Sequence, residues 1–165
     1  MLFNVNRGNL AVNGGFEQGL AGWSGICNVG IEGLPFAYEG LVAAAMGKPD
    51  NLREAVMFQD VPIPARRTFV LKFFVSGVAL NPADLTVDVL WLAPCGNVIC
   101  SALAAPVFAP GETTGPAAKG GYKAVVSYTE RAPASAAWAR IIFHKAPGAV
   151  QDNFLLLDNV IFVMQ

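Results

Sequence analysis

Residues able to perform covalent chemistry are sparse in this chain. His144 is the only histidine, and it stands in ARIIFHKAP on the same strand face as Arg140. A catalytic triad needs a serine or cysteine nucleophile and a carboxylate that converge on such a histidine, and the sequence contains no GxSxG elbow. We therefore interpret His144 as a histidine on the surface of a sheet.

The carboxylates make no better case for catalysis. Glycoside hydrolysis needs two acids that flank a cleft, whereas the acids available here are scattered: Glu32, Glu39, Glu54, Asp60, Asp88 and Glu130. The segment GETTGPAAKGG lacks the GxxxxGK[ST] spacing of a phosphate loop. The sequence predicts a protein that is not an enzyme.

Three cysteines, Cys27, Cys95 and Cys100, cannot all pair within one chain. Cys95 and Cys100 flank the turn PCGNVIC and would form a disulfide if they faced each other across a hairpin. A zinc site would need four ligands, and no second CxxC or HxxxH pair supplies them. We favour buried, unpaired thiols over the disulfide and over a metal site.

Composition and charge exclude several classes of partner. The formal net charge is -1, with no basic stripe, so nucleic acid is not expected. No apolar run approaches the length of a membrane helix, and no secretory signal is visible at the N-terminus. Hydrophobic residues make up 54% and charged residues 14% of the chain, which is more apolar surface than one small core can hide. We therefore predict a homo-oligomer.

Short runs rich in Val, Ile, Phe and Leu alternate with Gly, Pro, Asn and Asp clusters, which is an all-β pattern. The turn 95–97 predicts a hairpin, and Ala104 to Gly121 is expected to be a long loop. We predict one domain, 1–165, folded as a two-sheet antiparallel β-sandwich, with a closed barrel as the alternative. The expected strands are 9–12, 23–29, 40–46, 53–63, 68–78, 85–92, 98–103, 122–129, 137–145 and 154–164.

Alternation along two of these strands predicts which residues face the core. In TFVLKFFVSGV the inward set is Phe69, Leu71, Phe73 and Val75, with Lys72 and Ser76 on the wet side. In DLTVDVLW the inward set is Leu85, Val87, Val89 and Trp91, with Thr86 and Asp88 outward. Such sheets are expected to be wet on one face.

The opening stretch NGGFEQG is expected to turn the chain after the first strand. Asn13, Gly14 and Gly15 can adopt positive φ, and Phe16 can enter the core. Glu17 would then lie beside the sheet edge, where its carboxylate needs a partner.

Three stretches resemble the galactose-binding-like jelly roll of carbohydrate-binding modules: NLAVNGGFEQGLAGW, QDVPIPARRTFVLKFFVSG and FLLLDNVIFV. Together with LTVDVLWLAPCGNVIC and TERAPASAAWARIIFHKAP, they more closely resemble the N-terminal domain that precedes collagen-like repeats in surface proteins of Gram-positive spore formers. The chain departs from that family because it ends at Gln165 without Gly-x-y repeats.

The resemblance implies a structural calcium between the opening motif and the last strand. Its side-chain ligands would be Glu17 and Asp158, with Asn13 a weaker candidate, and calcium suits such hard oxygen donors. The alternative is that the two carboxylates accept backbone N–H bonds or pair with a base such as Arg53. Trp23 is interpreted as an anchor that closes the loop over the sandwich, in preference to a sugar platform.

A sugar site would need an aromatic face backed by polar side chains. Two sets of residues could supply it, although each residue is also compatible with packing: the wet strand face carrying Lys72, Phe74, Ser76 and Asp88, or the loop aromatics Phe36, Tyr38 and Tyr122. Phe74 could instead mark a protein interface, because an apolar ring on a wet face is costly unless covered.

Two functions follow. The first is a non-catalytic, oligomeric structural or assembly module, expected at a cell or spore surface from the family resemblance. The alternative is a carbohydrate-binding module that recognises a glycan through an aromatic-lined sheet face or loop end.

Overall fold

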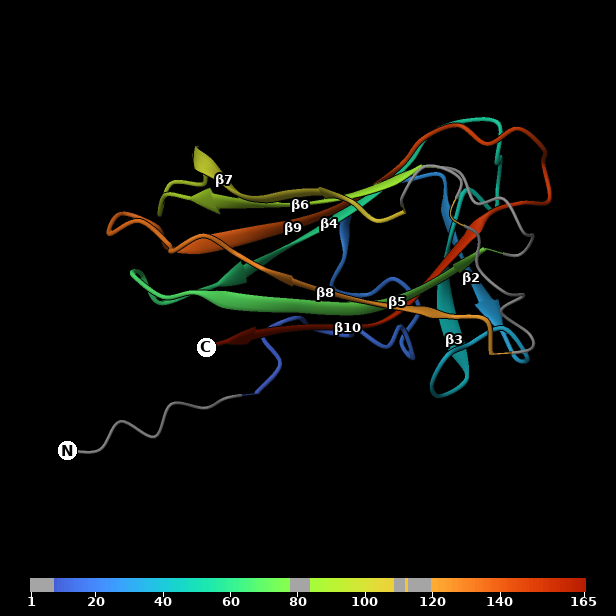
Figure 1. The fold of residues 1–165 in the computed structure, drawn as a ribbon, viewed down its shortest axis with the longest axis horizontal. Coiled ribbons are helices and arrows are strands. Elements are labelled where there is room, and N and C mark those ends of the chain that lie inside the picture. Colours follow the sequence, from blue (N-terminus) through green and yellow to red (C-terminus); the bar gives the residue numbers. More distant parts are fainter. Residues whose placement is uncertain (1–7, 78–83, 109–111, 113–119) are drawn as a thin grey trace.

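Ten antiparallel strands form two stacked five-stranded sheets in the computed structural model, which describes residues 8–77, 84–108, 112 and 120–165 (Figure 1). Sheet A has the order β1-β4-β9-β6-β7 and sheet B the order β2-β3-β10-β5-β8. The strands are β1 Ser24–Cys27, β2 Val29–Gly33, β3 Val42–Met46, β4 Ala55–Pro62, β5 Phe69–Gly77, β6 Leu85–Leu92, β7 Val98–Pro106, β8 Lys123–Tyr128, β9 Trp138–Lys145 and β10 Leu155–Met164.

The predicted two-sheet antiparallel sandwich is therefore confirmed. The described residues contain no helix, and hence none of the length and apolarity needed to cross a membrane. The hairpin at 95–97 joins β6 to β7, where the Ala93 amide donates to the Asn97 carbonyl at 2.9 Å.

Alternation selects the core as predicted. Phe69, Leu71, Phe73 and Val75 on β5 are fully buried, and the inward set of β6 is at most 1% exposed. Aromatic rings bridge the layers: Phe73 of β5 meets Phe143 of β9 edge-on, with centroids 5.0 Å apart. The two sheets thus share one continuous apolar interior.

Two strand predictions are wrong for local reasons. The run 23–29 is two strands, because Asn28 takes a left-handed conformation (φ 56°) that sends β1 into sheet A and β2 into sheet B. Its side chain stabilises the switch by donating to the Glu54 carbonyl at 3.1 Å and accepting from the Asp50 amide at 2.8 Å. Residues 9–12 form no strand but hydrogen-bond to β10, with the Leu10 amide 2.8 Å from the Phe162 carbonyl.

The glycines of the opening motif have a role that differs from the predicted one. Positive φ occurs at Asn13 (49°) and Phe16 (57°), not at Gly14 or Gly15. Gly14 is buried, and its carbonyl accepts from the Val160 amide at 2.9 Å. A Cβ there would overlap the backbone oxygen of Val160, whereas a Cβ at Gly15 would meet nothing within 4 Å.

The expected loop from Ala104 to Gly121 starts later than predicted. Strand β7 continues to Pro106, because residues 104–106 pair with the beginning of β6. Residues 109–111 and 113–119 of that loop lie outside the described residues.

The two adjacent glycines provide a matched test of the contact with β10. Gly14→Ala should lower the free energy of unfolding by about 2–3 kcal/mol, because the new methyl group must displace backbone. Gly15→Ala should change it by less than about 0.5 kcal/mol. Urea denaturation of both variants measures the difference, and equal stabilities would contradict the close approach.

Candidate functional site

The two carboxylates of the opening motif and the last strand hold one loop between them. The Glu17 Oε1 atom accepts from the Leu41 and Val42 amides at 2.8 and 3.0 Å. Asp158 is fully buried, and its Oδ2 accepts from the Tyr38 and Glu39 amides at 2.9 and 3.1 Å. Asp158 thus fastens segment 34–41 to β10, and Glu17 fastens the end of that segment to the opening motif. The suggested partner Arg53 is wrong, because it pairs with Asp50 at 3.2 Å.

Electrostatics at this point are dominated by negative charge. Burial raises the pKa of Asp158, three backbone N–H bonds oppose that rise, and the nearby charge of Glu17 adds to it. A depression of about 330 Å³ lies alongside, lined by Gly15, Glu17, Glu39, Gly40 and Asn159. The Asn159 amide nitrogen donates to Glu39 at 2.8 Å. Two glutamates and a buried aspartate therefore gather at one end of the loop.

Asn13, the weaker of the predicted metal ligands, is occupied within its own loop. Its Nδ2 donates to the Gly19 and Ala21 carbonyls at 3.0 and 2.9 Å, and its Oδ1 accepts from the Gln18 amide at 3.2 Å. Its backbone carbonyl accepts from the Trp23 indole at 3.3 Å. Trp23 is 5% exposed and stacks on Phe16, so the anchor interpretation of this tryptophan is confirmed.

Four of the five predicted ligand residues lie together on the outer face of sheet B. The Tyr38 ring stacks on Phe74 with centroids 3.7 Å apart, and Tyr122 meets Tyr38 edge-on at 5.4 Å. The Lys72 ammonium lies 5.1 Å from the Phe74 ring. The Tyr122 hydroxyl donates to the Phe36 carbonyl, and burial together with the charge of Asp158 raises the pKa of this tyrosine.

This face is drier than predicted. Phe74 is 8% exposed, because Tyr38 of segment 34–41 stacks on it. Ser76 is fully buried, and its hydroxyl donates to the Gly121 carbonyl at 2.8 Å. Beneath the segment lies a second small apolar cluster, made by Ala43, Ala45 and Leu156 with Phe36, Ala37, Tyr122 and Phe154. Phe74 is thus packing under Tyr38, whereas the Tyr38 side chain itself is 44% exposed.

Asp88 does not join these residues, and its assignment to a shared face with Lys72 is wrong. It lies on β6 of sheet A, where it pairs in register with Ile142 and Ala104. Lys72 lies on β5 of sheet B. The alternation of each strand correctly predicted that the residue points outward. It does not indicate to which of the two sheets the strand belongs.

The outer face of sheet A carries a group of residues that sequence reasoning missed. Asp60 of β4 stands opposite Arg140 of β9 and accepts two hydrogen bonds from its guanidinium, both 2.7 Å. That guanidinium lies 4.3 Å from the Phe58 ring, and the pKa of Arg140 is raised by its hydrogen bonds to Asp60. Trp138 is two residues from Arg140 on the same strand face and is 37% exposed.

A depression of about 320 Å³ opens beside this tryptophan, lined by Asp60, Pro94, Cys95, Gly96 and Trp138. It combines an indole with a carboxylate whose position is fixed by a bidentate ion pair. The signal available in the sequence was the alternation of WARIIFHK, which sets Trp138 on the same face as Arg140 and His144.

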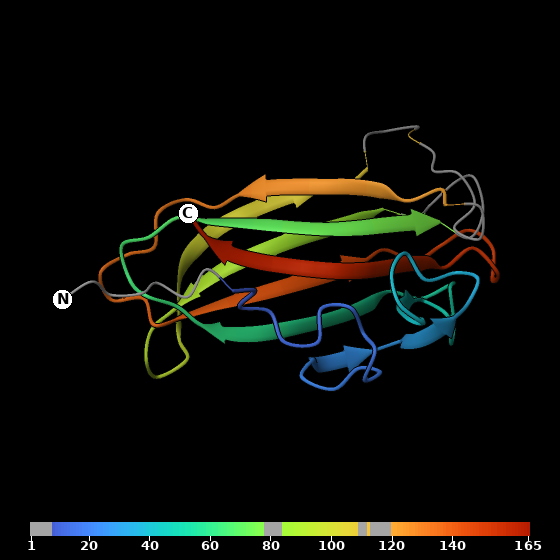
Figure 2. The same cartoon turned by 90° about the horizontal axis from the view of Figure 1, so that it is seen from below.

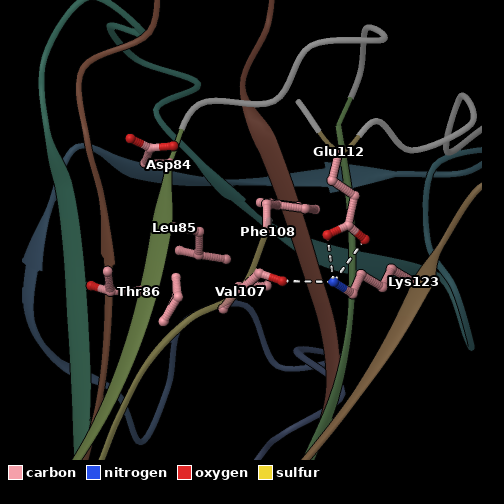
Figure 3. Close-up of a pocket in the computed structure, with 8 residues that line it drawn as sticks. Asp84, Leu85, Thr86, Val107, Phe108, Glu112 and Lys123 are labelled. Carbon is pink, nitrogen blue, oxygen red and sulfur yellow. Dashed lines mark hydrogen bonds and ion pairs between the residues drawn. The ribbon is translucent and has the colours of Figure 1, made fainter. Parts of the chain in front are cut away.

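A larger depression, about 740 Å³, lies where β6 begins and β7 ends (Figure 3). Leu85 and Phe108 line it, with Asp84 on one side and Lys123 and Glu112 on the other (Figure 3). The Lys123 ammonium contacts both Glu112 oxygens, at 2.7 and 2.9 Å, and donates to the Val107 carbonyl at 2.7 Å. The lysine here is thus engaged in holding Glu112 and the end of β7.

The sequence predictions for the histidine and for the cysteines have different outcomes. His144 lies on the outer face of sheet A with its Nε2 3.0 Å from Glu54, so its interpretation as a surface histidine is confirmed. The three thiols are free, and no Cys95–Cys100 disulfide is present. They are exposed, so the expectation that they are buried is wrong, because each lies in a hairpin turn or an edge strand.

Comparison with known proteins identifies the fold. No family model and no curated protein matches the sequence. A family 16 carbohydrate-binding module matches at 24% identity and TM-score 0.63, over 94% of this chain and 99% of that one. The module TmCBM61, in complex with β-1,4-galactotriose, matches at 16% identity and TM-score 0.64, over 95% and 99%.

A third similar structure is the enzymatically active domain of tailspike protein 4 from bacteriophage CBA120, at 15% identity and TM-score 0.65. This chain is covered to 95% but spans only 21% of that protein. At these identities the likeness shows the fold alone, which is the jelly-roll sandwich of carbohydrate-binding modules.

The buried carboxylate of Asp158 gives the site a stability test. In Asp158→Asn an amide NH₂ replaces one acceptor oxygen and faces a backbone N–H, so the free energy of unfolding should fall by about 2 kcal/mol. Asp88→Asn makes the same change on an open sheet face and should cost less than about 0.5 kcal/mol. Thermal and urea unfolding of both variants measure the difference, and an Asp158→Asn protein as stable as the parent would refute the anchoring role.

Proposed function

We propose that this chain is a non-catalytic module that binds a neutral glycan on the outer face of sheet A, around Trp138. The observation that carries the proposal is the exposed indole in a depression shared with Asp60. Sugar rings present an apolar C–H face to an aromatic ring while their hydroxyls need fixed polar partners. Trp138 would supply the first requirement, and the Asp60–Arg140 pair the second.

The polar partners are preorganised. The bidentate pair and the packing of Arg140 against Phe58 hold both groups before a ligand arrives, which lowers the entropy cost of binding. Asp60 would accept hydrogen bonds from two sugar hydroxyls, and Arg140 would donate its remaining N–H groups.

Charge on this face favours neutral sugars. Asp60, Asp88 and Glu54 contribute three carboxylates. Among the described strand residues of sheet A, Arg140 is the one arginine or lysine that is not buried. An anionic glycan would meet a net negative field. We therefore expect uronic acid polymers and sulfated glycans to bind poorly.

The similar structures support the glycan function over the assembly function. TmCBM61 is bound to β-1,4-galactotriose, and a CBM22-1 domain from Paenibacillus barcinonensis, at 16% identity and TM-score 0.53, is a xylan-binding domain. The predicted resemblance to spore-surface assembly domains has no counterpart among these structures and stays a prediction, as does a location at a cell or spore surface.

The binding test compares two exposed aromatic residues. Trp138→Ala should weaken binding of a glycan identified on a glycan array, with β-1,4-galactotriose and xylo-oligosaccharides as first probes, by about 10- to 100-fold. Tyr38→Ala, which removes an exposed ring that lies over sheet B, is the matched control and should leave the affinity unchanged. Isothermal titration calorimetry gives both dissociation constants. Loss of binding in Tyr38→Ala alone would move the site to the Lys72, Phe74, Tyr38 and Tyr122 group.

A structural calcium ion is the second part of the proposal. Hard oxygen donors gather where Glu17 and Glu39 line one depression and Asp158 lies buried behind it, and a cation there would offset their mutual repulsion. The oxygen donors here are of the type that calcium prefers, but their positions do not form a complete site. Within the described residues, no group of three or more His, Cys, Asp or Glu side chains has metal-site geometry. Glu17, Glu39 and backbone carbonyls would be the ligands in contact with the ion. Asp158, which was predicted as a ligand, would contribute its charge from behind the depression, because both of its oxygens accept backbone amides. Asn13 is occupied elsewhere.

Glu17→Gln separates the calcium role from the hydrogen-bonding role. Its amide oxygen can still accept from the Leu41 and Val42 amides, but the charge is lost. Calcium should raise the melting temperature of the parent by about 5 °C over chelator-treated protein, and Glu17→Gln should abolish that increase. Glu54→Gln, an exposed carboxylate on the other sheet, should retain it. A parent protein indifferent to chelator would eliminate the calcium site.

A further inference from the structure

We propose that β8 pairs antiparallel with β8 of a second copy of this chain, joining two B sheets into one continuous ten-stranded sheet. Strand β8 is the edge of sheet B, next to β5, as Figure 2 shows in orange and green. Within the described residues its only strand partner is β5, in an unbroken register from Val70↔Tyr128 to Val75↔Lys123. The other side of β8 is a regular edge suited to strand addition.

This edge lacks the devices by which monomeric proteins avoid pairing. Charged side chains, prolines, bulges and short length normally protect an edge strand. The run 124–128, AVVSY, has no charge and no proline, and the Lys123 ammonium is taken up by Glu112. Val126 is 51% and Tyr128 63% exposed, so the strand presents apolar side chains to water.

The other three edges are protected. Strands β1 and β2 have four and five residues, and β2 carries Glu32 paired with Lys48. Strand β7 is long, but its register against β6 shifts at two points, which is the signature of bulges. Among the described edges, β8 alone combines regular geometry with an uncharged, exposed sequence.

The side chains of β8 match those of a second, antiparallel β8 in size and charge. In an antiparallel pair with Val126 opposite the second Val126, Tyr128 of one copy stands opposite Ala124 of the other on the outer face. Val125 then stands opposite Ser127 on the inner face. A large side chain therefore meets a small one at each end, and no like charges oppose each other, which identifies a second copy as the occupant.

The pairing has a geometric consequence. The two-fold axis that relates antiparallel neighbours is perpendicular to the sheet, so the same faces of both copies lie on the same side. Both Trp138 faces would then point the same way, and the dimer could engage one polysaccharide surface twice. The proposed dimer depends on β8 alone, so a test of dimerisation does not depend on whether the chain binds a glycan.

The test is the solution mass of the full chain by light scattering and sedimentation from micromolar to submillimolar concentration. The parent should form a dimer. Val126→Lys should weaken association roughly 100-fold, because position 126 of one copy stands opposite position 126 of the other and the two introduced charges repel. Ile31→Lys is the control: it places the same charge at a 45%-exposed position on β2, the opposite edge of sheet B, and should leave the dimer intact.

Melting temperatures verify that the variants fold, and the exposure of Val126 makes a large loss of stability unexpected. A parent protein that is monomeric over the whole range overturns the proposal. A dimer that survives Val126→Lys also overturns it, because that dimer must use another surface.

Discussion

The arrangement of this sandwich depends on a break in the middle of β10. Register with β5 shifts between Asp158 and Ile161, and pairing with β3 ends at Leu157. Beyond that point the opening segment lies along the side of β10 that β3 leaves. The Asn9 side chain donates to the Val160 carbonyl and accepts from the Phe162 amide, and the Gly14 carbonyl accepts from the Val160 amide. A bulge in a central strand exposes backbone groups that must find partners. Here the chain that precedes the first strand supplies them.

The covered face of sheet B depends on Asp158, the last residue of β10 in regular register with β5 before this shift. Asp158 is turned outward beneath segment 34–41, where three backbone amides offset the cost of burying its carboxylate. With the segment held there, the Tyr38 ring covers Phe74. This end of sheet B therefore presents the Tyr38 ring in place of Phe74, whereas Trp138 on the outer face of sheet A is itself exposed.

Sequence periodicity was sufficient for the layers and for the core, because inward residues such as Phe73 and Val89 obey a two-residue repeat that burial enforces. Periodicity was insufficient where a local feature interrupts the regular pairing of a strand. Asn28 diverts the chain from one sheet to the other. Residues 9–12, predicted as a strand, form only isolated hydrogen bonds to β10 beside its register shift. The separation of Asp88 from Lys72, and the meeting of Asp60 with Arg140, depend on strand order, which no local pattern encodes.

Exposed apolar side chains occur in two different settings on this molecule, and the setting indicates the partner. Trp138 lies beside the Asp60–Arg140 pair, so any ligand there must also satisfy charged groups, as the hydroxyls of a sugar can. Val126 and Tyr128 lie on an edge strand with no charge between them and with backbone groups directed outward. Such a surface is satisfied by another strand, since only a strand pairs the backbone and covers the side chains together. The two surfaces lie on different sheets, so the binding of one partner does not obstruct the other.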